Sequence, residues 1–195
     1  MDVKVIPDFL PKPIFDQLSQ IIFAPSFSWH LSTTVVSNRI RPKENNKLFL
    51  LHHLVYEKNE YETLQSIDHH IMLLLVTDHM YYENLSNYYD VIEEPMPKGQ
   101  FLGIPNIENL IRIKINFYPN TTELHEHGHH IDYEYSHKGS LLSLNTCDGY
   151  TKIREPETKY PSVANTLLTF DPSEDHCSTT TTNAIGRFNI NINYQ

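Results

Sequence analysis

The last stretch of the chain alternates between apolar and polar residues. From Arg187 to Tyr194 the even-numbered positions are Phe, Ile, Ile and Tyr, whereas Arg187 is followed at odd positions by three asparagines. A two-residue period places one set on each face of an extended strand. The segment therefore predicts a β-strand with one apolar and one polar face.

Other segments of the chain carry strand patterns of different strength. Residues 111–118 alternate cleanly, and residues 141–145 alternate in part. Residues 163–170 form a short apolar run that Asp-Pro ends, and residues 27–31 alternate around Trp29. Short alternating runs bounded by turn residues are typical of β-strands.

Two segments show helical spacing instead. Pro11-Lys12-Pro13 opens the first, which we expect to end near residue 22. The second runs from residue 61 to about residue 85 and has an apolar stripe formed by Leu64, Ile67, Ile71, Leu74 and Leu75. Residues 93–99 are rich in turn-forming types and predict a surface loop. Helices followed by short strands indicate a β-sandwich or jelly roll with outer helices.

The composition indicates one soluble globular domain. The 195 residues are 39% hydrophobic and 20% charged, a length that a single core can fill. Only Cys147 and Cys177 are present, and we expect them to be free thiols in a reducing compartment. The N-terminus has no signal-peptide pattern and the longest apolar run, residues 71–76, is too short to cross a bilayer. We therefore expect a cytoplasmic protein without a membrane partner.

The charge of the chain argues against a nucleic-acid partner. The formal net charge is -9, whereas binding to phosphate backbones relies on lysine and arginine. The six glycines form neither a dinucleotide-binding motif nor a phosphate loop. Nucleotide chemistry has no support in the sequence.

Three residues offer a metal-binding set. His130 and Asp132 are two positions apart, so in an extended strand they lie on one face with about 6.6 Å between their α-carbons. With the later His176 they supply two imidazoles and one carboxylate, the arrangement that suits non-haem Fe(II) oxygenases because it leaves positions free. A bare His-x-Asp in a chain with twelve histidines is also typical of ordinary surface or core histidines.

The surroundings of these residues resemble a known family. The segments that carry the likeness are Phe117-Tyr118-Pro119, His130-Ile131-Asp132, Leu144-Asn145, Gly149-Tyr150-Thr151, His176 and residues 187–194. In order and spacing they resemble the prolyl-4-hydroxylase-like branch of the 2-oxoglutarate- and Fe(II)-dependent oxygenases. This resemblance implies a single domain over residues 1–195, with a helix-rich N-terminal part at 1–105. It places a double-stranded β-helix (jelly roll) core with the site at 106–195, and the N-terminal α-helices pack outside that core.

The resemblance also implies a role for each site residue. His130, Asp132 and His176 would be the catalytic iron ligands, and Arg187 would bind the far carboxylate of 2-oxoglutarate through its guanidinium fork. Tyr118 stands where relatives have a tyrosine whose hydroxyl hydrogen-bonds the cosubstrate. The sequence is equally consistent with a tyrosine that only packs at a strand end. Ser143 stands where some relatives have a tyrosine. Leu141 and Asn145 would line the same pocket.

The implied activity is that of a dioxygenase. Such an enzyme hydroxylates an unactivated C–H bond with Fe(II), O2 and 2-oxoglutarate, releases succinate and CO2, and in some cases uses ascorbate. The carboxylate of Asp132 favours hydroxylation, since related halogenases lack it. A prolyl residue of a peptide or protein is the first expected substrate, with small metabolites as the other class. The sequence does not give the oligomeric state.

A dense run of histidines supports a second hypothesis. In residues 125–130, an extended chain would place His125, His127 and His129 on the face opposite His130. Imidazoles suit zinc and nickel, so the alternative is a non-enzymatic jelly-roll metal-binding module that uses this segment.

Overall fold

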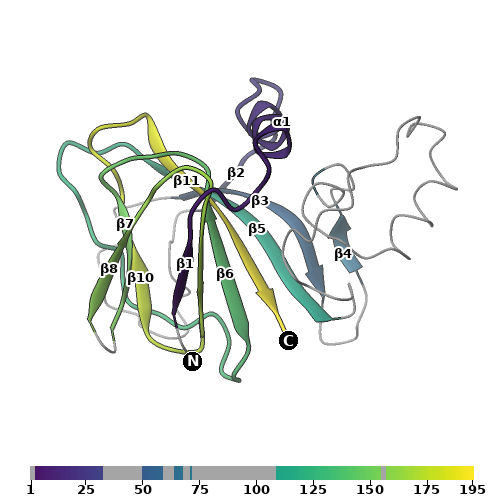
Figure 1. Cartoon of the computed structure of the whole chain (residues 1–195), viewed down its shortest axis with the longest axis vertical. Helices are drawn as coiled ribbons and strands as arrows, with labels where there is room; N and C mark the ends of the chain where they lie inside the picture. The colour runs from purple at the N-terminus through teal and green to yellow at the C-terminus, as the bar shows by residue number, and fades with distance from the viewer. Residues whose placement is uncertain (1–2, 33–49, 59–63, 68–70, 72–108, 155–156) are drawn as a thin grey trace, which may run out of the picture.

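The computed structural model describes residues 3–32, 50–58, 64–67, 71, 109–154 and 157–195. These residues form two antiparallel sheets and one helix (Figure 1). In chain order the elements are β1 (Lys4–Ile6), α1 (Lys12–Ile22), β2 (His30–Ser32), β3 (Leu50–Lys58), β4 (Leu64–Ile67), β5 (Leu110–Pro119), β6 (Lys138–Ser143), β7 (Tyr150–Ile153), β8 (Thr158–Pro161), β9 (Thr166–Phe170), β10 (His176–Ser178) and β11 (Gly186–Tyr194).

The large sheet has β11 near its centre. Its strand order is β1-β9-β6-β11-β5-β3-β2, with β4 paired to β3, and every pairing is antiparallel. The small sheet has the order β10-β7-β8 and lies to one side of the large one in Figure 1. Two facing antiparallel sheets connected in this way are typical of a jelly roll.

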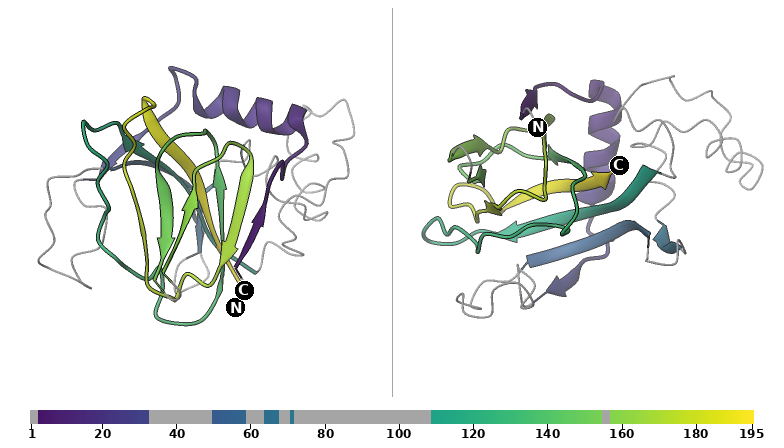
Figure 2. Two further views of the ribbon diagram at one scale, coloured as in Figure 1. Left: turned by 60° about the vertical axis from the view of Figure 1, so that its left-hand side comes forward. Right: turned by 90° about the horizontal axis from the view of Figure 1, so that it is seen from below.

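Helix α1 covers the outer face of the large sheet (Figure 2). The helix begins at Lys12, and Pro13 in its first turn has a fixed φ that suits a helix start. Its buried residues Ile14, Leu18 and Ile22 recur every four positions and pack in one core with the apolar face of β5 and β11. From β11 that core takes Phe188, Ile190 and Ile192.

The alternation along β5 and β11 gives the large sheet an apolar outer face and a polar inner face. The apolar residues face α1, and the polar residues between them face the space between the two sheets. On β11 these inner residues are Arg187, Asn189, Asn191 and Asn193, of which all but Asn191 are buried. Paired with Tyr118, Asn116, Lys114 and Arg112 of β5, they form a polar inner wall.

One glycine allows these central strands to approach. A Cβ built on Gly186 would lie 1.9 Å from the ring of Phe117, so no larger residue fits there without displacing that ring. The backbone immediately before Arg187 is held close to β5 for this reason.

Several predicted elements are present, some with different bounds. The helix to residue 22, the strand over 111–118 and the C-terminal strand are confirmed as α1, β5 and β11. The strand predicted over 141–145 is β6, which starts earlier and ends at Ser143. The strand predicted from 163 starts only at Thr166, because Asn165 turns the chain with a positive φ of 57°.

The N-terminal half differs more from the prediction. Residues Leu64–Ile67, predicted as part of a helix over 61–85, form β4 and pair with β3. The spacing of Leu64 and Ile67 suits a helix, but a neighbouring strand supplies backbone partners that a local pattern does not register. Of the rest of that segment only Ile71 is described, and it is buried. In the described part of residues 1–105, α1 is the one helix with assigned bounds, and Ile71 is also helical, so the expected outer helices are supported only there.

Other predictions need smaller corrections. Strand β3 has no counterpart among the predicted elements, and the strand expected at 27–31 is β2, which begins at His30. Trp29 instead packs on the core through its aromatic neighbours Phe27 and Phe117. The loop predicted at 93–99 lies outside the described residues. Within the described ranges, no helix has the length and apolar character needed to span a bilayer.

Candidate metal centre and cosubstrate cavity

Two histidines meet at a short β-bridge between distant parts of the chain. His130 lies in the loop before β6, and His176 begins β10. Their backbones exchange two hydrogen bonds, 2.8 Å from His130 N to His176 O and 3.0 Å in the reverse direction. The bridge places the two side chains next to each other, with ring centroids 4.5 Å apart.

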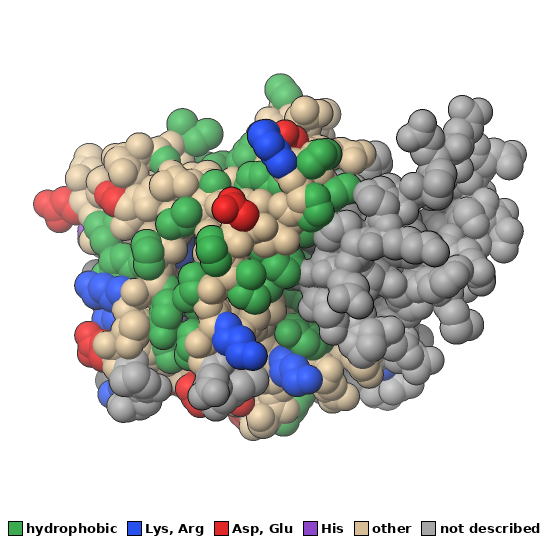
Figure 3. Space-filling view, viewed as in Figure 1, with side chains coloured by type: hydrophobic (Ala, Val, Ile, Leu, Met, Phe, Trp, Pro, Cys, Tyr) green, Lys and Arg blue, Asp and Glu red, His purple; other side chains and the backbone are tan. Residues whose placement is uncertain are grey.

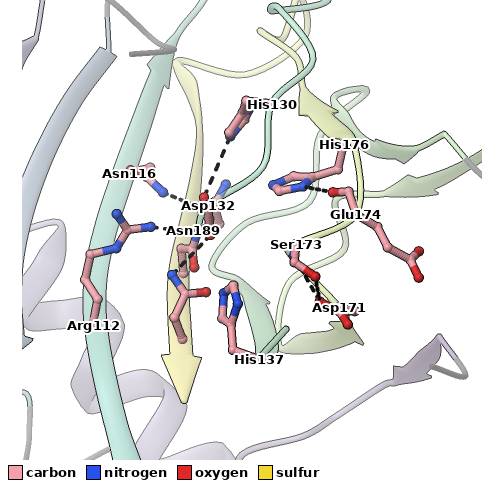
Figure 4. Close-up of polar contacts among 12 residues, drawn as sticks. Arg112, Asn116, His130, Asp132, His137, Asp171, Ser173, Glu174, His176 and Asn189 are labelled. Atoms are coloured by element: carbon pink, nitrogen blue, oxygen red, sulfur yellow. Dashed lines mark hydrogen bonds and ion pairs between the residues drawn. The ribbon is translucent and has the colours of Figure 1, made fainter. Parts of the chain in front are cut away.

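Asp132 completes this group, which we call the metal triad (His130, Asp132 and His176). One ligand atom from each of the three side chains lies within 4.8 Å of the others. Figure 4 shows the three side chains converging on the space between the sheets. Asp132 is held there because its backbone N–H donates to Pro172 O at 2.9 Å.

The hydrogen bonds of the two imidazoles define which nitrogen is free. His130 Nδ1 lies 3.2 Å from Gly128 O, and His176 Nδ1 lies 2.9 Å from Glu174 O. A carbonyl oxygen only accepts, so in each ring Nδ1 carries the proton and Nε2 keeps its lone pair. Both rings therefore present Nε2 in the form that binds a metal ion.

The two oxygens of Asp132 have different surroundings. Oδ2 accepts hydrogen bonds from the side-chain amides of Asn191 and Asn193, each at 3.1 Å, and lies 3.4 Å from Arg112 Nη2. Oδ1 faces His130, 3.9 Å from Nε2. The contacts to Oδ2 orient the carboxylate and leave Oδ1 directed at the two imidazoles.

Burial and neighbouring charges shift the pKa values of Asp132 and His130. Burial alone would raise the pKa of Asp132, but the positive charge of Arg112 and the histidine and lysine groups nearby hold that pKa well below its usual range. Burial, together with His176, lowers the pKa of His130 to about 4. At neutral pH the triad thus contains an ionised carboxylate and a neutral His130 imidazole, which are the forms that metals bind.

Arg187 is buried, and no carboxylate of the described residues pairs with it. It is 1% exposed, and its Nη2 donates to Thr151 Oγ1 at 2.6 Å. Its Nε and Nη1 atoms are buried and have no hydrogen-bond partner within the described ranges. Burial lowers the pKa of Arg187, and the ring of Tyr118 lies 5.6 Å from its guanidinium carbon. Buried guanidinium donors are normally paired, so this group is prepared for an anion.

A small cavity opens beside Arg187. Its volume is about 60 Å³, and besides Arg187 the polar residues that line it are Ser143, Thr151 and Thr166. Its apolar lining comes from both sheets, β1 included, and from the loop between β8 and β9, and consists of Val5, Leu141, Tyr160, Pro161, Val163 and Leu168. In Figure 3, hydrophobic side chains gather over the area of β1, β6 and β8 that borders it. An apolar cavity with one cation suits a small organic anion.

The structure separates the residues expected in this pocket. Leu141 and Ser143 line the cavity with Arg187, whereas Tyr118 is buried at its inner side against the guanidinium. Asn145 has a different place from the one expected. Its amide donates to Gly186 O at 2.9 Å and its Oδ1 accepts from Phe188 N at 2.9 Å, so it clamps the backbone on both sides of Arg187.

Four inner residues were not anticipated as site residues. Arg112, Asn191 and Asn193 orient Asp132, and Thr151 holds Arg187. The alternation of residues 111–118 and 187–194 could have revealed the first three, because the same two-residue period that puts Arg187 inside puts them on that face.

His127 also lies in the site, beside Tyr118. It is 5% exposed, its ring centroid is 5.1 Å from that of Tyr118, and its buried Nε2 has no hydrogen-bond partner. Burial, then the charge of Arg187, lowers its pKa to about 4. In the described part of the chain, His125, His127 and His129 do not come together as a set of metal ligands.

Comparison with solved structures identifies the fold. An oxidoreductase of the 2OG-Fe(II) oxygenase family from Burkholderia pseudomallei matches with a TM-score of 0.60 at 12% identity, over 99% of this chain and 85% of that one. A prolyl hydroxylase from Trichoplax adhaerens, solved with a peptide fragment of the hypoxia inducible factor oxygen degradation domain, gives 0.54 at 15% identity over 98% and 82%. A Pseudomonas putida prolyl-4-hydroxylase gives 0.53 at 12% identity over 99% and 92%.

Sequence comparison adds nothing to this. No family model matches the chain, and no curated protein matches it. The structural likeness covers nearly the whole chain and confirms, for the fold, the resemblance to 2-oxoglutarate- and Fe(II)-dependent oxygenases of the prolyl hydroxylase type. The protein is thus a jelly roll with the oxygenase fold.

Proposed function

We propose that the protein is an Fe(II)- and 2-oxoglutarate-dependent dioxygenase that hydroxylates an unactivated C–H bond. The observation that carries this proposal is the pairing of two features inside one jelly roll. The metal triad offers two free Nε2 atoms and one carboxylate oxygen, and Arg187 offers unpaired guanidinium donors at a small cavity. Neither feature alone would define a reaction.

The donor set fits iron, and the cavity fits the cosubstrate. Two imidazoles and one carboxylate leave coordination positions open, which suits non-haem Fe(II). The unpaired Nε and Nη1 of Arg187 match the two oxygens of a carboxylate, and the apolar lining fits the carbon chain of 2-oxoglutarate. Bound iron and 2-oxoglutarate would together supply O2 activation, with release of succinate and CO2.

The chain's own residues orient the proposed iron ligand Asp132 and the proposed cosubstrate anchor Arg187. Arg112, Asn191 and Asn193 fix Asp132 so that one oxygen stays directed at the histidines. Asn145 and Thr151 fix Arg187 from its backbone and from its guanidinium. This second layer of contacts holds both anchors in place before any ligand binds, which lowers the cost of ordering them.

We further propose a prolyl residue of a peptide or protein as substrate. One support is that the Trichoplax adhaerens structure contains a prolyl hydroxylase with a peptide. Another is a pair of tyrosines next to the triad, Tyr133 and Tyr135, whose rings stack with centroids 5.4 Å apart. Tyr150, a third candidate for an aromatic wall, donates instead to Glu126 at the other end of the small sheet.

The decisive experiment tests the iron and cosubstrate together. Anaerobic addition of Fe(II) and 2-oxoglutarate should give the weak visible charge-transfer band of the chelate, and Asp132→Ala should alter it. Calorimetry should show that 2-oxoglutarate binding depends on Arg187. Absence of both the band and the binding would overturn the proposal. Succinate release with a panel of prolyl peptides and metabolites then tests the substrate.

A further inference from the structure

The β-bridge between His130 and His176 carries side chains on two sides, and only the side facing the interior belongs to the metal triad. In extended backbone, neighbouring residues point to opposite sides. His130 and His176 face the interior, so the adjacent His129 and Cys177 face the other way, toward Glu126. Glu126 reaches this side from its own bridge with Thr179, two residues beyond Cys177.

These three side chains form a compact group. One ligand atom each from Glu126, His129 and Cys177 lies within 4.8 Å of the others, the same criterion that the metal triad meets. In a tetrahedral zinc site, bonds of about 2.0–2.3 Å put neighbouring ligand atoms about 3.5 Å apart. Side-chain movements of about 1 Å would therefore close the group around an ion.

The His129 imidazole and the Cys177 thiol are both available as metal ligands. The Nδ1 of His129 is buried and has no hydrogen-bond partner in the part of the chain that the structure describes, although Asp175 Oδ1 lies 3.8 Å away. Cys177 is 0% exposed and is not in a disulfide. If Nε2 of His129 held an ion, its Nδ1 would face the Asp175 carboxylate, as metal-bound histidines commonly do.

Glu126 is already oriented by its neighbours. Lys152 Nζ and Tyr150 Oη each donate to one of its oxygens. A carboxylate has about four lone-pair positions, so these contacts leave room for a metal, and ligating carboxylates are usually hydrogen-bonded in this way. The 36% exposure of the Glu126 side chain also gives an ion access from solvent.

We propose that Glu126, His129 and Cys177 form a second divalent-metal site, separate from the metal triad and suited to zinc. A thiolate, an imidazole and a carboxylate are zinc ligands, whereas the triad lacks the soft sulfur donor. The site shares the His130–His176 bridge with the triad, so an ion here would brace the backbone that positions both triad histidines. It does not depend on the proposed activity.

Cobalt distinguishes the two sites because only one contains sulfur. Metal-free, reduced protein is titrated with Co²⁺ without oxygen, and absorption is followed in the near ultraviolet, where thiolate-to-cobalt charge transfer appears. The band should be present in the unaltered protein, absent in Cys177→Ser and retained in Cys147→Ser, the matched control with the other cysteine. His130→Ala, which damages only the triad, should retain it.

Further measurements distinguish a loss of metal binding from a loss of the folded structure. Circular dichroism checks each variant, and the exposed Glu126→Gln should weaken Co²⁺ binding by about 10- to 100-fold, the range that loss of a ligand's supporting contact already gives. Equilibrium dialysis should show one fewer bound ion per chain in Cys177→Ser. The proposal is overturned by no near-ultraviolet band at saturating Co²⁺, or by a band that survives in Cys177→Ser. Failure of the oxygenase proposal would appear elsewhere, in the Fe(II) and 2-oxoglutarate titration.

Discussion

Replacing Arg187 with methionine should stabilise the ligand-free protein while abolishing its response to 2-oxoglutarate. Arg187 is buried with Nε and Nη1 unpaired, so in the absence of a ligand its charge is a cost to folding. Methionine has a similar length and fills the space with apolar atoms. The two effects have opposite signs, which no general loss of folding would reproduce.

The magnitudes follow from the contacts. Exchanging a buried charged group for a well-packed apolar one stabilises proteins by about 1–4 kcal/mol, and a domain of this size gains about 2–4 °C in melting temperature for each kcal/mol. Removing one partner of a buried charged pair costs about 2–5 kcal/mol of binding, so the affinity for 2-oxoglutarate should fall about 30-fold to several thousand-fold.

Thermal unfolding with and without 2-oxoglutarate measures both effects, with Mn²⁺ in place of Fe(II) to prevent turnover. At a concentration 100 times the dissociation constant, the ligand should stabilise the unaltered protein by about 2.7 kcal/mol. Arg187→Met should melt higher without ligand and show no shift with it. Arg154→Met is the matched control, since Arg154 is 54% exposed and its ion pair with Asp175 is of the weak surface type.

Two results would refute this reasoning. If Arg187→Met is less stable than the unaltered protein without ligand, the guanidinium stabilises the fold through its contacts and does not destabilise it. If it still responds to 2-oxoglutarate, the cosubstrate does not use this cavity. Arg187→Lys should lie between, because an ammonium keeps the charge but cannot form the two-pronged contact.

Three further outcomes test the surroundings of the site. Arg112→Met should weaken Mn²⁺ binding about 10- to 100-fold by calorimetry because Asp132 loses an orienting contact at 3.4 Å, and unchanged affinity would contradict that role. Gly149→Ala should cost about 1–3 kcal/mol in urea unfolding and weaken 2-oxoglutarate binding, because its Cβ would lie 2.7 Å from Arg187 Cδ; wild-type behaviour in both would refute the close packing. The metal-free protein should lose stability as the pH falls from about 6.5 to about 4. In this range His127 is protonated in the unfolded chain, whereas in the folded protein its pKa is only about 4, so protonation favours unfolding. His127→Asn should remove up to about 3 kcal/mol of this dependence in urea unfolding across that range, and an unchanged dependence would contradict it.

The C-terminal half was predictable because its patterns are local. The two-residue period of β5 and β11 needs no knowledge of the partner strand, since any sheet that buries one face imposes it. It also placed Arg187 on the polar face, and the spacing of His130 and Asp132 put both on one side of the chain. The order of these residues led to the metal triad that the structure brings together.

The N-terminal half was less predictable because its pattern is ambiguous. Leu64 and Ile67 are three apart, which a helix and an irregular strand both accommodate, and pairing with β3 decided between them. The contacts of Asn145 depend on distant residues in a similar way. Its side-chain amide hydrogen-bonds the backbone of Gly186 and Phe188. These contacts depend on a strand over forty residues away.

The sequence by itself determined which residue types stand at which face of each strand. It thereby placed Arg187 on the polar face of its strand and made His130, Asp132 and His176 candidates for binding one metal ion. Only the tertiary structure decided that two nitrogens of the Arg187 guanidinium have no hydrogen-bond partner among the described residues, and that Arg112 and two asparagines orient Asp132. Only it put Glu126, His129 and Cys177 together on the outer face of the bridge. The physical reason is that burial and pairing depend on contacts between segments far apart in the chain, and a local period fixes directions without fixing partners.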